Sequence, residues 1–115
     1  MNPDSAVIER GIETICLEVL NGNQKGEKKE FSSSDVIKIG RGMDSRLQIL
    51  DPSASKKHAL LKKGFLDHVY LEDKQSRNGT FVNEERITKK YALQNGDIIR
   101  IGYTEIRYSY ISRNQ

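Results

Sequence analysis

Apolar residues in this chain recur at every second position, in short runs that polar turn residues separate. A period of two is typical of strands that bury one face, because successive side chains of a strand point to opposite sides. Asn-Gly, Asp-Pro and single glycines stand between the runs, where they favour turns. The runs that predict strands are 15–19, 37–39, 47–49, 58–63, 66–72, 81–82, 86–87, 97–101 and 106–110.

Many short strands without helical stretches between them predict an all-β fold, an antiparallel β-sandwich. The chain has 115 residues, which suits one domain with a single core. Residues 1–12 lack a clear period, so we expect a flexible N-terminal tail there and the domain over residues 13–113. The lysine-rich segment 21–30 is expected to form a mobile hairpin loop.

The composition says more about the charge and cellular compartment of the protein than about its function. The formal net charge of +3 mildly favours an anionic partner. The single cysteine, Cys16, rules out an internal disulfide and lies in an apolar run, where a small buried side chain is the simplest role. No apolar stretch reaches the roughly 18 residues of a membrane span, and the N-terminus has no secretory signal pattern. We therefore expect a cytoplasmic protein, or a nuclear one in a eukaryote.

Three short polar motifs between the predicted strands carry the candidate chemistry. They are Gly40-Arg41, residues 55–58 with the sequence Ser-Lys-Lys-His, and residues 76–80 with the sequence Ser-Arg-Asn-Gly-Thr. Together they offer a guanidinium group, hydroxyl groups, ammonium groups and an amide, which are the groups that bind a phosphate monoester. If one end of a sandwich brought them together, the three motifs would form a single site.

Each motif alone also has a simpler interpretation. Arg41 fits a solvated arginine after a strand, the two lysines fit a solvated charge pair, and Asn78-Gly79 fits a tight turn. His58 opens a predicted strand on the same side as Leu60. We expect it to point inward as a neutral structural residue that is hydrogen-bonded to loop backbone.

The residues give little support to catalysis, metal binding or nucleic-acid binding. The chain has two histidines and one cysteine, lacks a Gly-x-Ser-x-Gly elbow and shows no nucleophile beside a base. His58, His68 and Cys16 do not have the spacing of metal ligands. Tyr108 and Tyr110 belong to the predicted core stripe rather than to a stacking surface. We expect a non-enzymatic protein without metal or cofactor.

The order of the motifs resembles the forkhead-associated (FHA) domain family. The matching residues are Gly40-Arg41, Ser55-x-x-His58, Asn78-Gly79 and Asn95-Gly96-Asp97 before an Ile-x-Ile-Gly strand. The resemblance covers residues 14–111, which is nearly the whole chain. It implies an eleven-stranded β-sandwich whose loops at one end bind phosphothreonine peptides.

The resemblance also implies roles for single residues. Arg41 and Ser55 would contact the phosphate, and Lys56 would contact the phosphate or the peptide backbone beside it. Arg77 would reach the phosphate or the peptide, and Asn78 would hydrogen-bond the peptide backbone. A small pocket for the threonine γ-methyl group would select phosphothreonine over phosphoserine.

Gly40, His58 and Gly79 are implied to shape the loops of the site. Two positions depart from the family pattern. Ser53 stands where the family can have a basic residue, and residues 83–85 read Asn-Glu-Glu where an Asn-Gly turn is common. The first departure removes a possible phosphate contact, for which the neighbouring cations can compensate. The second departure affects only a hairpin turn, because asparagine also tolerates the left-handed conformation that such a turn can require.

The sequence thus predicts a phosphothreonine-dependent protein-binding module of Ser/Thr kinase signalling. Its expected partner is a phosphothreonine-containing protein or peptide, with no nucleic acid and no membrane, and the module is expected to be a monomer. A phospho-independent protein–protein scaffold with the same fold is the alternative. Equal binding of phosphorylated and unmodified peptide would favour that alternative.

Overall fold

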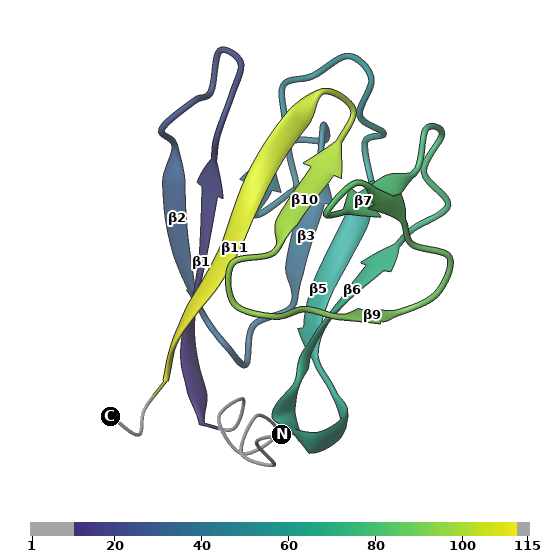
Figure 1. The fold of residues 1–115 in the computed structure, drawn as a ribbon. Coiled ribbons are helices and arrows are strands. Elements are labelled where there is room, and N and C mark those ends of the chain that lie inside the picture. Colours follow the sequence, from purple (N-terminus) through teal and green to yellow (C-terminus); the bar gives the residue numbers. More distant parts are fainter. Residues whose placement is uncertain (1–10, 113–115) are drawn as a thin grey trace.

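The computed structural model describes residues 11–112, which form two β-sheets packed face to face (Figure 1). The strands are β1 (Ile12–Val19), β2 (Lys28–Ser32), β3 (Ile37–Gly40), β4 (Leu47–Gln48), β5 (Ala59–Lys63), β6 (Val69–Asp73), β7 (Thr80–Val82), β8 (Glu85–Arg86), β9 (Tyr91–Ala92), β10 (Ile98–Ile101) and β11 (Thr104–Ser112). One 3₁₀ turn, η1 (Phe65–Asp67), joins β5 to β6. The predicted eleven-stranded β-sandwich is confirmed.

The six-stranded sheet has the order β2-β1-β11-β10-β7-β8, and the five-stranded sheet has the order β4-β3-β5-β6-β9. Neighbouring strands are antiparallel with one exception, because β3 and β4 pair in parallel. After β3 the loop returns to the start of that strand, where the backbone N–H of Arg46 donates to the carbonyl oxygen of Lys38 at 2.8 Å. The chain then runs along β3 in the same direction. The purely antiparallel expectation is therefore wrong at this edge of the sheet.

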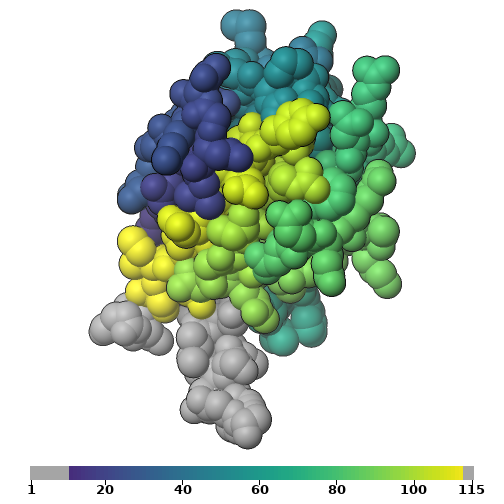
Figure 2. Space-filling view, turned by 45° about the horizontal axis from the view of Figure 1, so that its top comes forward, coloured from purple at the N-terminus to yellow at the C-terminus, as the bar shows by residue number. Residues whose placement is uncertain are grey.

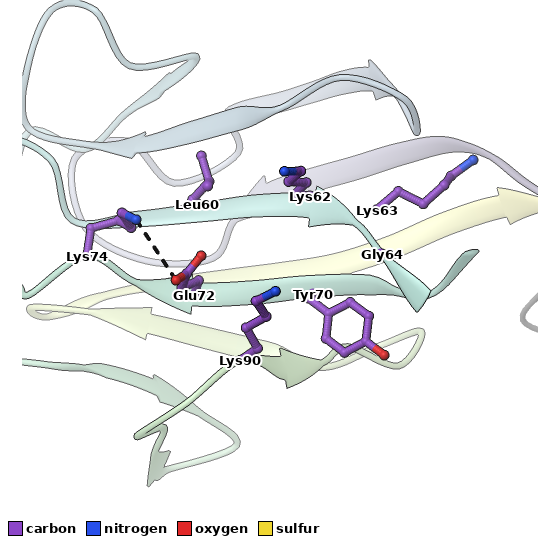
Figure 3. A pocket seen from close by; sticks show the side chains of 8 residues that line it. All are labelled: Leu60, Lys62, Lys63, Gly64, Tyr70, Glu72, Lys74 and Lys90. Carbon is purple, nitrogen blue, oxygen red and sulfur yellow. Dashed lines mark ion pairs between the residues drawn. The ribbon is translucent and has the colours of Figure 1, made fainter. Parts of the chain in front are cut away.

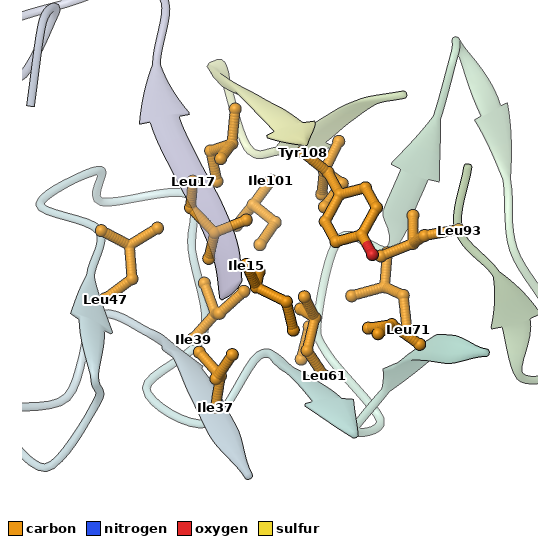
Figure 4. Close-up of a cluster of buried hydrophobic side chains, with 14 of the residues drawn as sticks. Ile15, Leu17, Ile37, Ile39, Leu47, Leu61, Leu71, Leu93, Ile101 and Tyr108 are labelled. Atoms are coloured by element: carbon orange, nitrogen blue, oxygen red, sulfur yellow. The ribbon is translucent and has the colours of Figure 1, made fainter. Parts of the chain in front are cut away.

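The core lies between the sheets and consists of the inward-facing residues of every strand except β8 and β9, together with Ile49, Ala54, Ile87 and Leu93 from the segments between strands (Figure 4). Ile15 and Leu17 from β1 face Ile37 and Ile39 from β3, and all four side chains are at most 1% exposed. Tyr108 is fully buried in the same cluster. Each such side chain stabilises the fold by about 1.5–3 kcal/mol relative to an exposed one. The period of two in the sequence therefore reports the packing of the sandwich.

Two predicted segments have different boundaries in the structure. Lys28, which the sequence places in a loop, begins β2 and pairs with Glu18 of β1. The charged residues of this edge strand hide the alternation, because Phe31 is its one buried residue. Leu66, predicted to begin a strand, lies in the β5–β6 turn with a positive φ of 57° and is 53% exposed. The strand begins at Val69, so the apolar side chain of Leu66 wrongly predicted an earlier start of the strand.

The inward side of β5 also differs from the prediction. Ala59 and Leu61 point into the core, whereas Leu60 is half-buried on the outer face. His58 is nevertheless fully buried, because it belongs to the loop before β5 rather than to the strand. The predicted flexible tail falls on residues 1–10, which lie outside the described residues, and on Gly11 and Ile12, of which Ile12 begins β1.

Candidate functional site

The three polar motifs lie in loops at one end of the sandwich, the upper end in Figure 1. These loops are residues 41–46 between β3 and β4, residues 49–58 between β4 and β5, and residues 74–79 between β6 and β7. Figure 2 turns this end toward the reader and shows the teal and green parts of the chain side by side on it. Segments far apart in the sequence therefore share one surface.

Hydrogen bonds join the three loops directly. The backbone N–H of Arg41 donates to the carbonyl oxygen of Ser55 at 2.9 Å. The backbone N–H of Arg77 donates to the hydroxyl oxygen of Ser55 at 2.9 Å. The side-chain amide of Asn78 donates to the carbonyl oxygen of Ser53 at 2.9 Å. Residues 53–55 thus form the centre of the cluster, with one loop on either side.

Gly40 permits the close approach of the first two loops. It is the buried last residue of β3, and a Cβ atom on it would collide with the carbonyl oxygen of Lys56. The sequence predicts a glycine here for a sharp turn, but Gly40 is not among the glycines with positive φ. The position requires glycine because there is no room for a side chain, and not because the backbone adopts an unusual conformation. Gly40 therefore shapes the site by allowing the loop with Lys56 to pack directly against β3.

Arg41 is exposed, and part of its guanidinium group is held in place. Its Nε–H donates to the carbonyl oxygen of Ala54 at 2.9 Å, which orients the planar group over the second loop. Within residues 11–112, its two Nη atoms have no hydrogen-bond or ion-pair partner. An arginine anchored in this way presents a prearranged fork of N–H donors to a ligand.

Ser55 and Lys56 add a hydroxyl and a cation beside this fork. Ser55 is half-buried, and its oxygen accepts the bond from Arg77, so the hydroxyl hydrogen is free to donate to a ligand. Lys56 is exposed and has no ion pair with any other described residue. Arg77 is exposed as well and carries a third cation. The cluster therefore presents positive charge that neighbouring carboxylates do not neutralise.

His58 connects the second loop to the third from beneath. Its Nδ1 accepts the backbone N–H of Ser55 at 2.9 Å, and its Nε2 lies 2.8 Å from the carbonyl oxygen of Gly79. Because Nδ1 accepts, we assign the ring hydrogen to Nε2, and the ring is neutral. The structural placement expected of this histidine is therefore observed.

Asn78 and Gly79 form the exposed tip and the buried base of the third loop. Asn78 donates through one amide N–H to the second loop, while its Oδ1 has no partner among residues 11–112. Gly79 has a φ of 92°, which other residues rarely adopt, and a Cβ atom there would lie 2.7 Å from Nε of Arg86. A hollow of about 240 Å³ beside Asn78 is lined by Ser53, Arg100, Gly102 and Tyr103.

Asp73 organises the third loop, and the sequence analysis missed it. Its carboxylate accepts hydrogen bonds from the hydroxyl groups of Ser76 at 2.5 Å and Thr80 at 2.6 Å, and from the backbone N–H of Ser76. Burial by itself would raise the pKa of Asp73, but these hydrogen bonds outweigh it, and the pKa lies below its usual value. An aspartate three residues before a serine is a local loop signal that could have revealed it.

Asp51 plays the same part in the second loop. Its carboxylate accepts the backbone N–H groups of Ser53 and Tyr103, each at 2.8 Å, and the hydroxyl group of Thr104. Burial alone would raise the pKa of Asp51, yet these bonds hold it below its usual value. Asp51 thereby connects the site to the turn between β10 and β11. The sequence indicated the turn at this residue, but not its partner about 50 positions away.

Two other kinds of site are not found in the part of the chain that the structure describes. No group of three or more His, Cys, Asp or Glu side chains there could hold a metal ion. No helix within residues 11–112 is long and apolar enough to cross a membrane.

Comparison with known proteins agrees with this geometry. The family model "FHA domain" matches residues 37–102. The chain is 36% identical over 90 residues to FhaB, an FHA domain-containing protein of Mycobacterium tuberculosis, and the match covers 78% of this chain and 57% of FhaB. It is 36% identical over 85 residues to the yeast DNA damage response protein kinase DUN1, covering 68% of this chain and 17% of the kinase. The chain thus spans little more than half of FhaB.

Solved structures give the same result at the level of the fold. A structure from an analysis of phosphothreonine-dependent FHA domain interactions has a TM-score of 0.73 and 28% identity, and the match covers 84% of this chain and 95% of that one. The FhaA FHA domain, solved in complex with an intracellular domain of another protein, has a TM-score of 0.71 and 29% identity, with 82% and 98% covered. The chain belongs to the FHA domain family, whose members are phosphothreonine-binding modules.

Proposed function

We propose that this domain binds phosphothreonine-containing segments of partner proteins at the three-loop site and acts as an adaptor in Ser/Thr kinase signalling. One observation carries the proposal. Arg41 is anchored through Nε to Ala54 while both of its Nη atoms are available, and the free hydroxyl hydrogen of Ser55 lies in the loop beside it. This combination suits the tetrahedral oxygens of a phosphate group.

The negative charge of the ligand is complementary to the positive charge of the site. A phosphothreonine carries about −1.5 to −2 charges at pH 7 and offers three acceptor oxygens. We assign the bidentate contact to Arg41, one hydroxyl contact to Ser55 and a charge contact to Lys56. Arg77 stands at the edge of the same group and supports it through its charge. The site therefore holds donors and cations and needs no nucleophile, as expected of a binding module rather than an enzyme.

Asn78 is assigned to the peptide beside the phosphate. Its Oδ1 and its second amide hydrogen can accept from and donate to the backbone of an extended peptide. The hollow next to Asn78 leaves room for a side chain of that peptide. Phosphate and backbone contacts then act together, so neither a free phosphate nor an unmodified peptide satisfies the whole site.

The expected affinity follows from these contacts. Hydrogen bonds to charged groups contribute about 1.5–3 kcal/mol each. Two or three of them together with several backbone contacts are sufficient for a micromolar dissociation constant, about −8 kcal/mol. Because much of that energy belongs to one side chain, replacing Arg41 with alanine should weaken binding at least tenfold. The fold should change little, since Arg41 is exposed.

The experiment selects a peptide from an oriented phosphothreonine library and titrates it by calorimetry into the wild type, R41A and R41K. R41K keeps the charge but loses the planar fork, so its affinity should lie between the other two. Phosphoserine and unmodified versions of the peptide are the ligand controls. Chemical-shift changes confined to residues 41, 53–56 and 77–79 would support the site. An unchanged affinity of R41A, or equal binding of unmodified peptide, would refute the proposal.

A further inference from the structure

The outer face of the five-stranded sheet carries a row of lysines that the three-loop site does not use. Lys38 of β3 and Lys62 of β5 point outward, because the buried residues next to them in each strand face the core. The strand register places Lys38 opposite Leu60 and Lys62 opposite Tyr70. Further lysines surround these positions. We define the lysine tract as Lys38, Lys57, Lys62, Lys63, Lys74 and Lys90.

Few carboxylates neutralise the lysine tract. Lys74 forms an ion pair with Glu72 at 3.9 Å, as the dashed line in Figure 3 shows. The other five lysines have no ion pair with any of residues 11–112. Asp44 is the one further carboxylate that lines the same surface. Soluble surfaces usually intersperse both signs of charge, so six ammonium groups against two carboxylates make this face strongly basic.

Two hollows connect the lysine tract to the phosphate candidates. The upper hollow, of about 430 Å³, is lined by Lys38, Lys57 and also by Lys56. The lower hollow, of about 490 Å³, is lined by Lys62, Lys90 and others drawn in Figure 3. Leu60 and Lys74 line both hollows, which are therefore contiguous. A basic surface thus runs from the site loops down the outer face of β5.

The length of this surface sets the size of an occupant. Residues 59–63 of β5 span four steps of about 3.3 Å, which gives a length of about 13 Å below the loop that holds Lys56. An extended peptide of about four residues would cover this strand. A ligand that begins at the phosphate contacts can therefore reach the far lysines with a short continuation of its own chain.

We propose that the lysine tract binds an acidic segment of the same phosphorylated partner, rich in Asp and Glu and continuous with its phosphothreonine. This inference rests on the proposed function, which delivers that peptide to the upper end of the tract. Nucleic acid fits the face less well, because its cations are all lysines and Tyr70 is the one aromatic residue that lines the two hollows. Proteins that bind single-stranded nucleic acid combine positive charge with several aromatic side chains on which the bases stack.

The test adds six alternating Glu and Asp residues to the library-selected phosphothreonine peptide, at its N-terminus in one version and its C-terminus in another. Matched versions carry Gly and Ser instead. Fluorescence anisotropy with the full chain compares them at low and high salt. Each exposed lysine–carboxylate pair strengthens binding by about two- to threefold, so one acidic version should bind about tenfold more tightly at low salt. High salt should remove the gain.

Charge-reversal variants test whether the gain in affinity depends on the lysine tract. K62E should reduce the gain about threefold, and K62E combined with K90E should abolish it, while the Gly–Ser peptide binds as before. K28E is the matched control, because Lys28 is likewise an exposed strand lysine without an ion pair in the described chain, but on the other sheet. It should leave the gain intact.

Several results would overturn the inference. An acidic extension that adds no affinity at either end, or a gain that persists in the K62E/K90E variant, contradicts it. The acidic extension adds nothing in a further case, in which single-stranded DNA or phosphatidylserine vesicles bind in a Lys62-dependent manner. The lysine tract then recognises nucleic acid or an anionic membrane instead of an acidic peptide. If the unextended phosphopeptide fails to bind while the acidic segment alone binds through Lys62, the phosphothreonine site is wrong and the continuity with it is refuted.

Discussion

Replacement of His58 tests how the three-loop site is held together. The side chain is fully buried, and its two ring nitrogens bond to the backbone of two different loops, at Ser55 and at Gly79. Alanine at this position would remove both hydrogen bonds and leave a cavity. The carbonyl oxygen of Gly79 would be left without its partner in a buried position.

The magnitude follows from these losses. Each hydrogen bond contributes about 0.5–1.5 kcal/mol, and a buried carbonyl without a partner costs about 1–3 kcal/mol. We expect His58→Ala to destabilise the domain by about 3 kcal/mol. For a domain of this size that corresponds to a fall in melting temperature of roughly 10 °C or more. Phosphopeptide affinity should fall as well, because Ser55 and the loop of Asn78 lose their common support.

The assay is thermal unfolding by circular dichroism, followed by peptide titration at a temperature where each variant is folded. H58N keeps an acceptor near the position of Nδ1, and H58Q keeps a donor near the position of Nε2. Each should recover part of the lost stability, and H58N should recover more of the affinity because it supports Ser55. A melting temperature of H58A within 2 °C of the wild type would refute the reasoning.

Three further predictions concern positions outside the phosphate contacts. Glu84 has a φ of 74° in the turn between β7 and β8, so Glu84→Gly should raise the unfolding free energy by about 0.5–1 kcal/mol in urea titrations. Gly40→Ala should cost about 1–3 kcal/mol and lower the melting temperature by several degrees, because the new methyl group meets the carbonyl of Lys56. The lowered pKa values of Asp51 and Asp73 stabilise the fold above their usual pKa of 3.8, and this contribution should disappear as the pH falls below that value. Urea midpoints at pH 5 and pH 3 check this, and D73N should show a smaller difference between them.

The departure from the family pattern at residues 83–85 shows what local sequence can indicate. Asparagine was expected to tolerate a left-handed backbone there, and Asn83 has a φ of 50°. Its side chain explains the choice, since Oδ1 accepts the backbone N–H of Ile98 and Nδ2 donates to Asp97. Glu84 also takes a positive φ, which its residue type does not predict. Pairing of β7 with β8 imposes that conformation on it.

Most of the strands, the buried stripes at Ile15–Val19 and Ile37–Ile39, and the loop positions of Arg41, Ser55 and Asn78 were readable in the chain, whereas the count of eleven strands came from the family resemblance. The reason is that strand pattern and turn chemistry depend on neighbours one to four positions apart. Other features required the assembled sandwich: the parallel pairing of β4, the inward side of β5, the role of Gly40 and the bonds of Asp51 to the turn between β10 and β11. Each depends on contacts between segments that lie apart in the sequence and that folding brings together. The site itself is of this second kind, since its residues occur along the sequence but its geometry exists only where three loops meet.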